Sequence, residues 1–307
     1  MKPNFYMLVG LPGSGKSKIA EELNGIVFSS DSLRKELWGS EEIQGDNQEL
    51  FSILHQRIKD NLKKGKNCIY DATNIKAKRR KAFLKEIEKI DCKKICIFVA
   101  TDINVCLNRN DERDKKVPYE VIKRMYLSFD VPQYREGWDE IVIQRTLDEN
   151  NDYNIFKFID YLESVEHDNP HHMLTIGSHI QAVVKHIIDK YKLTFAGDIH
   201  RLERLITAAV YHDIGKNTTK VYIDKDGNKT EEAHYYNHEN VSAYMYMMYE
   251  KEEKIQNNLE DVLYVADLVG LHMRLFDNKG ATKLKTIVSE REYEDLCILH
   301  EADIICA

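Results

Sequence analysis

The chain has few of the features that mark disordered, cross-linked or membrane-spanning proteins. With 5 prolines, 14 glycines and no internal repeat in 307 residues, it has neither low-complexity nor solenoid character. Its six cysteines form no CxxC pair, so we expect buried, reduced thiols and no disulfide framework or zinc knot. No apolar run reaches the roughly 18 residues that a membrane span needs, and the N-terminus lacks a signal-peptide pattern. We therefore expect a cytoplasmic protein without membrane contacts.

The composition is that of a globular chain with two unlike halves. Hydrophobic residues make up 43% of the sequence, which is enough for two domains of ordinary size, each with its own core. The excess of negative charge lies in residues 151–307, and so do all of the 12 histidines except His55. We expect the two halves to perform different chemistry.

Apolar runs alternate with helical patterns in the first half, whereas helical patterns alone fill the second. Runs at 5–9, 26–28, 68–70, 95–100 and 140–143 alternate with amphipathic segments near 16–23, 46–64, 76–89 and 118–129. This alternation predicts an α/β domain over residues 1–150, with a parallel sheet covered by helices. After the polar segment 147–152, the patterns near 153–165, 176–192, 199–212, 237–253, 259–273 and 289–305 predict an all-helical domain over residues 151–307.

The segment GLPGSGKS lies between the first expected strand and the first expected helix and fits the pattern GxxxxGK[ST]. In such a loop, backbone amides and the helix N-terminus bind phosphate oxygens, the lysine reaches the outer phosphates and the hydroxyl ligates Mg²⁺. The strand-loop-helix context disfavours the alternative of a purely structural glycine turn. We predict a site for ATP and Mg²⁺ formed by Gly10, Pro12, Gly13, Ser14, Gly15, Lys16 and Ser17.

Two carboxylates follow the next expected strands, at the sheet edge where open α/β proteins bind ligands. Asp31 is expected either to take a proton from an attacking hydroxyl or only to cap the helix that follows. Asp71 and Asn74 end the third expected strand. There Asp71 is expected to hold a magnesium-bound water, with structural hydrogen bonding as the alternative.

The polar run 107–118 has the composition of a mobile lid. One of its arginines is expected to neutralise charge on the transferring phosphoryl group, whereas Lys115 and Lys116 are expected to be solvated. The basic segment 76–94 either follows a phosphate backbone or is a solvated helix face.

Together these motifs resemble the 5′-hydroxyl polynucleotide kinase domain of bacteriophage and bacterial end-healing enzymes, over residues 4–145. The resemblance implies that Lys16 and Ser17 serve the nucleotide and that Asp31 is the general base. It further implies that Arg34 contacts an acceptor phosphate and that Arg113 clamps the donor phosphates. The residues that carry the likeness are the P-loop, Asp31, Arg34, Asp71, Thr73, Asn74, Arg79, Arg80, Arg109, Asn110, Arg113, Val117 and Pro118. Among them, Asp71, Asn74 and Arg79 are expected at the substrate and Arg109 at the nucleotide.

Histidines and aspartates on the expected helices of the second half form a candidate metal site. His212 and Asp213 end a buried-looking helix, where such groups are normally paired or bound to metal. The dipeptide by itself is weak evidence, because His167 and Asp168 repeat it. Imidazole and carboxylate ligands favour Mn, Ni, Co, Fe or Zn over calcium. We predict one or two such ions, bridged by Asp213, that activate water at a phosphoester; the ligand candidates are His179, His212, Asp213, His238, His272 and Asp303.

The order His, His-Asp, Asp resembles the HD phosphohydrolase superfamily over residues 166–307. The resemblance makes His179, His212, Asp213 and Asp303 the primary ligands and adds His238 and His272 as the second pair of two-metal members. Lys216 is expected to bind substrate phosphate, and at least one of His171 and His172 is expected at the surface. The chain ends four residues after Asp303, so we expect a truncated final helix that gives this ligand less support.

A kinase and a phosphohydrolase in one chain match the two ends of a broken RNA. Many nucleases leave a 5′-hydroxyl and a 2′,3′-cyclic phosphate, and a ligase can join neither. We therefore predict end healing of RNA or DNA ahead of an RNA ligase, by 5′ phosphorylation and by hydrolysis of a cyclic phosphate or a 2′- or 3′-phosphate. Two alternatives stay open: a small-molecule or nucleoside kinase joined to a nucleotide phosphohydrolase, and a nucleic-acid-binding protein with an inactive HD domain.

Overall fold

A computed structural model describes residues 2–41, 43, 45–148, 154–170, 173–249 and 258–307. The chain forms two compact units, one of residues 1–125 and 132–149 and the other of residues 126–131 and 150–307. Residues 126–131, expected in the first domain, thus belong to the second unit, where Tyr126 and Phe129 pack edge-on against Tyr244 with ring centroids 5.2 and 4.9 Å away. The boundary predicted at residue 150 lies outside the described residues and stays a prediction.

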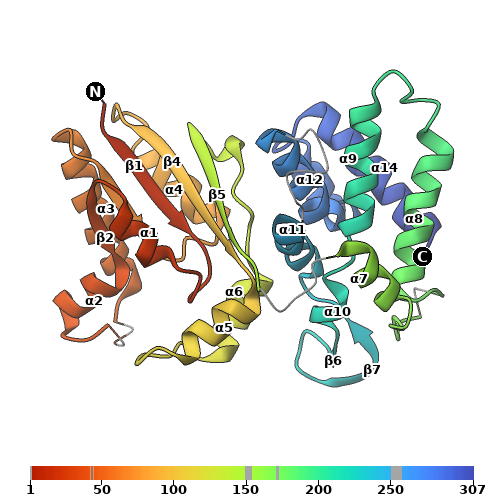
Figure 1. The fold of residues 1–307 in the computed structure, drawn as a ribbon, viewed down its shortest axis with the longest axis horizontal. Coiled ribbons are helices and arrows are strands. Elements are labelled where there is room, and N and C mark those ends of the chain that lie inside the picture. Colours follow the sequence, from red (N-terminus) through yellow and green to blue (C-terminus); the bar gives the residue numbers. More distant parts are fainter. Residues whose placement is uncertain (1, 42, 44, 149–153, 171–172, 250–257) are drawn as a thin grey trace. The chain divides into compact units, whose positions relative to one another are not determined.

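The first unit is built on a five-stranded sheet in the order β2-β3-β1-β4-β5 (Figure 1). Every ladder in it is parallel, and the central β1 strand is apolar and largely buried, as expected for a strand covered on both faces. The predicted α/β fold is therefore confirmed. The strands are β1 (Asn4–Val9), β2 (Ile26–Ser29), β3 (Cys68–Asp71), β4 (Lys93–Thr101) and β5 (Glu140–Thr146).

The register of the sheet brings the expected phosphate-binding segments to one edge. Asp71, the last residue of β3, lies level with Leu8 of β1 on one side and with Ser29 of β2 on the other. Because all three strands run in the same direction, the loops that follow them leave from the same edge. The helices of this unit are α1 (Lys16–Glu22), α2 (Ser30–Trp38), α3 (Asn47–Lys63), α4 (Ala77–Glu86), α5 (Ile103–Asp111) and α6 (Tyr119–Leu127), with the 3-10 helix η1 (Tyr134–Glu136). α6 ends in residues of the second unit.

The second unit consists mainly of helices, as predicted (Figure 1). α8 shows why: its buried residues include Ile176, Ile180, Val183 and Ile187, spaced three and four apart, and His179 lies on the same stripe. A candidate ligand is thereby carried into the core by an ordinary amphipathic helix. The helices are α7 (Ile155–Leu162), α8 (Ile176–Tyr191), α9 (Ile199–Tyr211), α10 (Lys216–Thr219), α11 (His238–Tyr249), α12 (Leu259–Leu271), α13 (Asn278–Leu284) and α14 (Glu290–Ile305), with the 3-10 helix η2 (His272–Phe276).

The second unit also contains a β-hairpin, so the expectation of an entirely helical domain is wrong at this point. β6 (Val221–Ile223) and β7 (Lys229–His234) pair antiparallel. Asp226 and Gly227 lie in the connecting turn, and Gly227 has φ +89°, which a glycine adopts without strain. Asp-Gly between short polar and β-branched runs is a hairpin signal.

The remaining expectations concern cysteines and membranes. All six cysteines are free thiols; four are buried, whereas Cys297 and Cys306 are partly exposed. In the described part of the chain, none of the helices combines the length and the apolar character that a bilayer span would need.

Candidate phosphate-transfer and metal sites

The backbone of the loop between β1 and α1 already has the conformation of a phosphate cradle. Gly13 and Gly15 have φ of +82° and +99°, the left-handed region that glycine tolerates best. A Cβ atom on Gly13 would lie 2.2 Å from the carbonyl oxygen of Cys106, so a larger residue would displace the loop. Gly15 then forms the N-cap of α1, whose first amides face the loop. Pro12 and Ser14 are buried beside them.

Lys16 and Ser17, which the sequence predicts to meet the outer phosphates and Mg²⁺, begin α1. The Nζ atom of Lys16 is buried and donates to the Leu11 carbonyl at 2.7 Å. Burial lowers the pKa of Lys16 to about 8, although the nearby Asp71 charge opposes the shift. Ser17 Oγ donates to Asp71 Oδ2 at 3.0 Å, and burial raises the pKa of that carboxyl against the opposing charge of Lys16. The Ser17 and Asp71 oxygens are adjacent and fit a hydrated Mg²⁺ ion.

Asp31 is placed as an accessible carboxylate and is not the helix cap. Ser29 caps α2, because its side chain accepts from the amides of Asp31 and Ser32, so the capping alternative for Asp31 is wrong. The Asp31 side chain is 68% exposed and its Oδ1 atom lies 2.8 Å from Arg34 Nη1. Arg34 is itself 12% exposed and also donates to Asn47 at 3.1 Å. The guanidinium thus orients a carboxylate that a substrate hydroxyl can reach.

Some residues after β3 hold the phosphate loop in place, and others are exposed to solvent. The Asn74 side-chain amide donates to the Leu8 carbonyl at 2.9 Å, and the Gly10 amide donates to the Thr73 carbonyl at 3.0 Å. This segment therefore holds the start of the phosphate loop in place. The Asn74 side chain, which was expected at the substrate, is hydrogen-bonded to the backbone of β1. Arg79, five residues further along the chain, is exposed, as a residue that meets substrate would be.

Arg80, which the resemblance pairs with Arg79, is buried. It donates to both Glu136 oxygens, at 2.7 and 2.6 Å, and to the Asn74 carbonyl at 2.9 Å. Glu136 accepts further hydrogen bonds from the Gln133 amide and the Trp138 indole. This paired cluster supports the Asn74 turn from behind and was not identified from the sequence.

The expected lid is helical in its first part, because α5 continues to Asp111. Arg109 Nη1 donates to the Ser14 carbonyl at 3.3 Å, on the phosphate loop. Asn110 is buried and pairs with both backbone groups of Val117, at 3.0 and 2.8 Å, which closes the segment between them into a fixed loop. Arg113, on this loop, is exposed, and its charge lowers the pKa of Lys16. Lys115 is exposed and paired with Glu41 at 3.2 Å.

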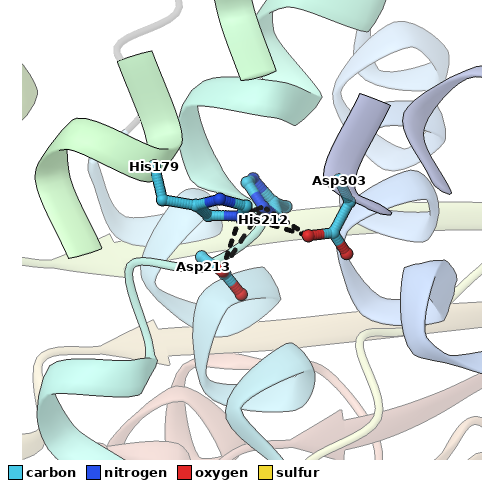
Figure 2. A group of neighbouring side chains, drawn as sticks. All are labelled: His179, His212, Asp213 and Asp303. Atoms are coloured by element: carbon cyan, nitrogen blue, oxygen red, sulfur yellow. Dashed lines mark hydrogen bonds and ion pairs between the residues drawn. The ribbon is translucent and has the colours of Figure 1, made fainter. Parts of the chain in front are cut away.

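The six predicted metal ligands of the second unit converge on one buried centre. His179 comes from α8, His212 and Asp213 follow α9, and Asp303 comes from α14 (Figure 2). Ligand atoms of these four residues lie within 4.8 Å of one another, and those of Asp213, His238 and His272 form a second such group. All six residues are buried. Asp213 belongs to both groups.

The two oxygens of Asp213 face different histidine pairs. Oδ2 lies 3.4 Å from Nε2 of both His179 and His212, and His179 Nε2 lies 3.1 Å from Asp303 Oδ1. Oδ1 lies 3.2 Å from His238 Nε2 and 3.9 Å from His272 Nε2. One carboxylate between two imidazole pairs is the arrangement expected of a bridging ligand in a two-metal site.

The four imidazoles are oriented by the backbone. Nδ1 of His179, His212, His238 and His272 faces the carbonyls of Cys306, Ala209, Tyr235 and Val269, at 3.1, 2.7, 2.9 and 2.7 Å. A carbonyl only accepts, so each Nδ1 carries a hydrogen and each Nε2 is directed to the centre, which is how metal-binding imidazoles are oriented. Asp213 Oδ2 is buried without a hydrogen-bond partner of ordinary geometry. The donor set thus fits divalent transition-metal ions.

Metal binding needs neutral imidazoles and ionised carboxylates, and the pKa shifts at this centre favour these states for His212, His272 and Asp213 but not for His179. Burial lowers the pKa of His212, and it lowers that of His272 to about 3. For His179, burial is outweighed by the Asp303 hydrogen bond and the Asp213 charge, which raise the pKa. Burial would raise the pKa of Asp213, but the charge of Lys216 and the neighbouring histidines hold it well below the usual range.

Close packing brings the chain after Asp213 against α11. A Cβ atom on Gly215 would lie 2.4 Å from the His238 carbonyl and 2.8 Å from the Ser242 amide, so only glycine allows this approach. Lys216 Nζ lies 2.7 Å from Asp213 Oδ2, where the resemblance expects a phosphate-binding group. His171 and His172 lie outside the described residues.

His167 is a buried residue at this centre that the sequence singled out only as half of an uninformative pair. Its Nε2 atom lies 3.4 Å from Lys216 Nζ, and burial, together with the Lys216 charge, lowers its pKa to about 4. A histidine on an irregular segment has no periodicity to mark it as buried, so no sequence signal was available.

Protein-family models match each half of the chain. Residues 5–132 match the family described as an AAA domain, and residues 171–307 match the HD domain family. The chain joins a P-loop kinase domain to an HD domain. A kinase domain of this type implies ATP and Mg²⁺, and an HD domain implies a divalent metal ion. The kinase-HD domain pair expected from the sequence is confirmed.

The L-seryl-tRNA(Sec) kinase of Methanococcus maripaludis is 32% identical over 163 residues, which make up 48% of this chain and 61% of the relative. This chain therefore spans less than two thirds of that curated protein. A chain of the Pnkp1/Rnl/Hen1 RNA repair complex is 20% identical, with a TM-score of 0.37 over 40% of this chain and 42% of its own. A putative kinase from Chloroflexus aurantiacus is 14% identical, with a TM-score of 0.39 over 50% of this chain and 93% of its own. Structural likeness at this level carries no argument about function.

Proposed function

We propose that this protein heals broken nucleic-acid ends, with RNA ends as the main substrate. The P-loop domain phosphorylates a 5′-hydroxyl with ATP, and the HD domain hydrolyses a 2′,3′-cyclic phosphate or a 2′- or 3′-phosphate. The products carry the ends that a ligase needs, so an RNA ligase is the proposed downstream partner. The observation that carries the proposal is that one chain holds both a phosphate loop with a nearby exposed carboxylate and a buried group of six His and Asp side chains.

The kinase half of the proposal is supported by the surroundings of Asp31. This exposed carboxylate, oriented by Arg34, can accept the proton of an incoming hydroxyl while the transferring phosphoryl group lies against Lys16. Arg113 supplies positive charge from the lid. An acceptor carboxylate that is open to solvent, together with the exposed Arg79, suits a substrate whose bulk stays outside the protein.

The phosphohydrolase half is supported by the Asp213 centre. The proposed ligands hold one or two ions of Mn, Ni, Co, Fe or Zn, which would supply Lewis-acid activation of water and of the phosphoester. Asp213 spans the two ligand groups, and its charge is balanced by Lys216 at 2.7 Å. Lys216 in turn can bind a substrate phosphate oxygen.

A second candidate function is favoured by the curated relative, whose name describes a kinase of a seryl group carried by tRNA. On that model, the acceptor of the P-loop domain is a small hydroxyl compound or an RNA-linked one, and the HD domain hydrolyses a nucleotide. The two candidates differ in what the kinase labels: a 5′-terminal hydroxyl of any oligonucleotide, or a hydroxyl outside the strand terminus.

The test offers ATP and an RNA with 5′-hydroxyl and 2′,3′-cyclic phosphate ends to the Mn²⁺-loaded protein. We expect Asp31→Asn to abolish only 5′ labelling and Asp213→Ala to abolish only 3′ processing. Asp189→Asn, at an exposed position of α8, is the matched control and should retain both. Labelling of nucleosides or seryl-tRNA without labelling of the oligonucleotide would establish the second candidate instead, and loss of both activities from either variant would contradict two independent sites.

A further inference from the structure

His167 is held in a fixed position beside the metal centre. The backbone around it is bonded to the end of β7: the Ala233 amide donates to the Asp168 carbonyl at 2.8 Å, and the Asn169 side chain donates to the Ala233 carbonyl at 3.0 Å. The Tyr235 hydroxyl donates to the His167 carbonyl. Because the Tyr235 carbonyl also orients the ligand His238 at 2.9 Å, one connection between β7 and α11 fixes both histidines.

The ring of His167 has a defined donor and a defined acceptor. Nδ1 lies 2.6 Å from the Leu174 carbonyl, which only accepts, so Nδ1 carries the hydrogen. Nε2 faces Lys216 Nζ at 3.4 Å, and because an ammonium group only donates, Nε2 is the acceptor of this contact. This imidazole is uncharged in that state.

Lys216 is thereby held between two different acceptors. Its Nζ atom lies 2.7 Å from Asp213 Oδ2 and is buried. Metal ions bound at Asp213 would compete with the ammonium group for that carboxylate. With metal ions on the Asp213 carboxylate, the neutral Nε2 atom of His167 would still hold the ammonium in place without cancelling its charge, and that charge would then be open to an anion.

We propose that His167 is a positioning residue whose Nε2 atom holds the Lys216 ammonium at the metal centre, where it binds an oxygen of the substrate phosphate. The identity of the anion rests on the proposed function of the HD domain. His167 itself does not bind metal in this assignment, which separates it from the six ligands.

Asparagine and glutamine substitutions test the two ring nitrogens separately. In His167→Gln the side-chain oxygen can take the place of Nε2, whereas His167→Asn can keep only the bond to Leu174. The probe is inorganic phosphate, titrated calorimetrically into the full-length, Mn²⁺-loaded protein. We expect His167→Asn to weaken phosphate binding about tenfold, and His167→Gln to bind almost as the parent does. Both variants should retain the Mn²⁺ content of the parent.

Two controls separate the proposal from a loss of structure. His200→Asn changes an exposed histidine of α9 and should leave phosphate binding unchanged. In a Lys216→Ala background, the difference between asparagine and glutamine at position 167 should disappear, because the interacting partner is gone. The Mn²⁺ content of each variant reports that the second unit is intact, because the six proposed ligands come from separate segments of that unit.

Three results would overturn the proposal: equal phosphate affinity of the asparagine and glutamine variants, a loss of Mn²⁺ in His167→Asn, or no measurable phosphate binding by the parent. The proposed function fails separately. A protein that binds phosphate with the expected pattern but hydrolyses no RNA end would keep His167 in its assigned role and reject end healing.

Discussion

The two sites of this chain are assembled in opposite ways. In the HD domain every candidate ligand is a buried side chain, and six of them from several helices already face one centre. In the kinase domain the backbone of the phosphate loop is formed, but the reactive side chains at its rim, Asp31 and Arg113, are exposed. The side chains proposed to bind metal lie inside the core of the second unit, whereas those proposed to meet ATP and the acceptor lie at the surface of the first.

The difference follows from the free-energy cost of burying charged groups without a partner. Imidazoles and carboxylates in a protein core are stable only when they are paired or bind metal, so the HD ligands must be in place when the core packs. ATP and the proposed nucleic-acid acceptor would bring their own negative charge from solvent, so the groups proposed to meet them have to be reachable. Removing single side chains can test this contrast.

Removing Asp213 should have the largest effect. Asp213→Ala deletes the only residue common to both ligand groups, so we expect the metal content to fall to none and 3′ processing to become undetectable. His272→Ala removes one group only and should retain one ion. Metal analysis of the purified proteins measures both. Retention of two ions by Asp213→Ala would show that the carboxylate does not bridge.

The exposed lid arginine should come next. Arg113→Ala removes a positive charge from the transferring phosphoryl group, and we expect the turnover rate of the kinase reaction to fall about 10³-fold. Lys115→Ala, two residues away and paired with Glu41, is the control and should stay near the parental rate. Equal losses of turnover in both variants would mean that any positive charge on the segment 107–118 raises the rate and that Arg113 has no specific role.

A third substitution tests whether the buried Arg80–Glu136 ion pair stabilises the first unit, and does not concern catalysis. Arg80→Leu leaves the buried Glu136 carboxylate without the positive charge that balances it, so the free energy of unfolding of the first unit should fall by about 3–5 kcal/mol. Arg79→Leu, at the exposed neighbouring position, should change it by at most about 0.5 kcal/mol. Trp38 and Trp138 are the only tryptophans and both lie in the first unit, so urea titrations followed by tryptophan fluorescence report on this unit. Similar losses from both substitutions would contradict the assigned role of Arg80.

The smallest expected effect is a pH dependence of ATP binding. Burial lowers the pKa of Lys16 to about 8, so the ammonium loses its proton as the pH rises through that value and its attraction to phosphate is lost. We expect KM for ATP to rise several-fold between about pH 7 and about pH 9. Lys16→Arg stays charged throughout that range and should bind ATP more weakly but without this dependence. A parental KM that is constant over the range would contradict the role of Lys16.

The helices and strands that the sequence predicted are those in which buried residues recur at a regular spacing. Each of the five strands was expected within a few residues of its observed bounds, because apolar runs bounded by polar segments identify buried strands. The β6–β7 hairpin was missed because its residues are largely exposed and polar, although its Asp-Gly turn was a usable signal. For the Asp31 carboxylate the sequence left two alternatives open; the cap provided by Ser29 rules out the capping role, and the role as general base stays a prediction.

The site was predictable where residue type and order limit the chemistry. Histidines and aspartates on buried helix faces indicated a metal site, and the phosphate loop has a fixed spacing. His167 and the Arg80–Glu136 pair were not recognised, because their importance lies in contacts between residues 49 and 56 positions apart. Such separations leave no local pattern.

The amino-acid sequence by itself determined which chemical groups the chain contains and which helices and strands carry them, because periodic burial and short motifs are local properties. Only the tertiary structure decided that the two oxygens of Asp213 face different histidine pairs, that Arg80 supports the phosphate loop from within, and that a neutral histidine lies against Lys216. These arrangements depend on the packing of elements distant in sequence, and packing distances of a few ångströms decide whether two groups interact.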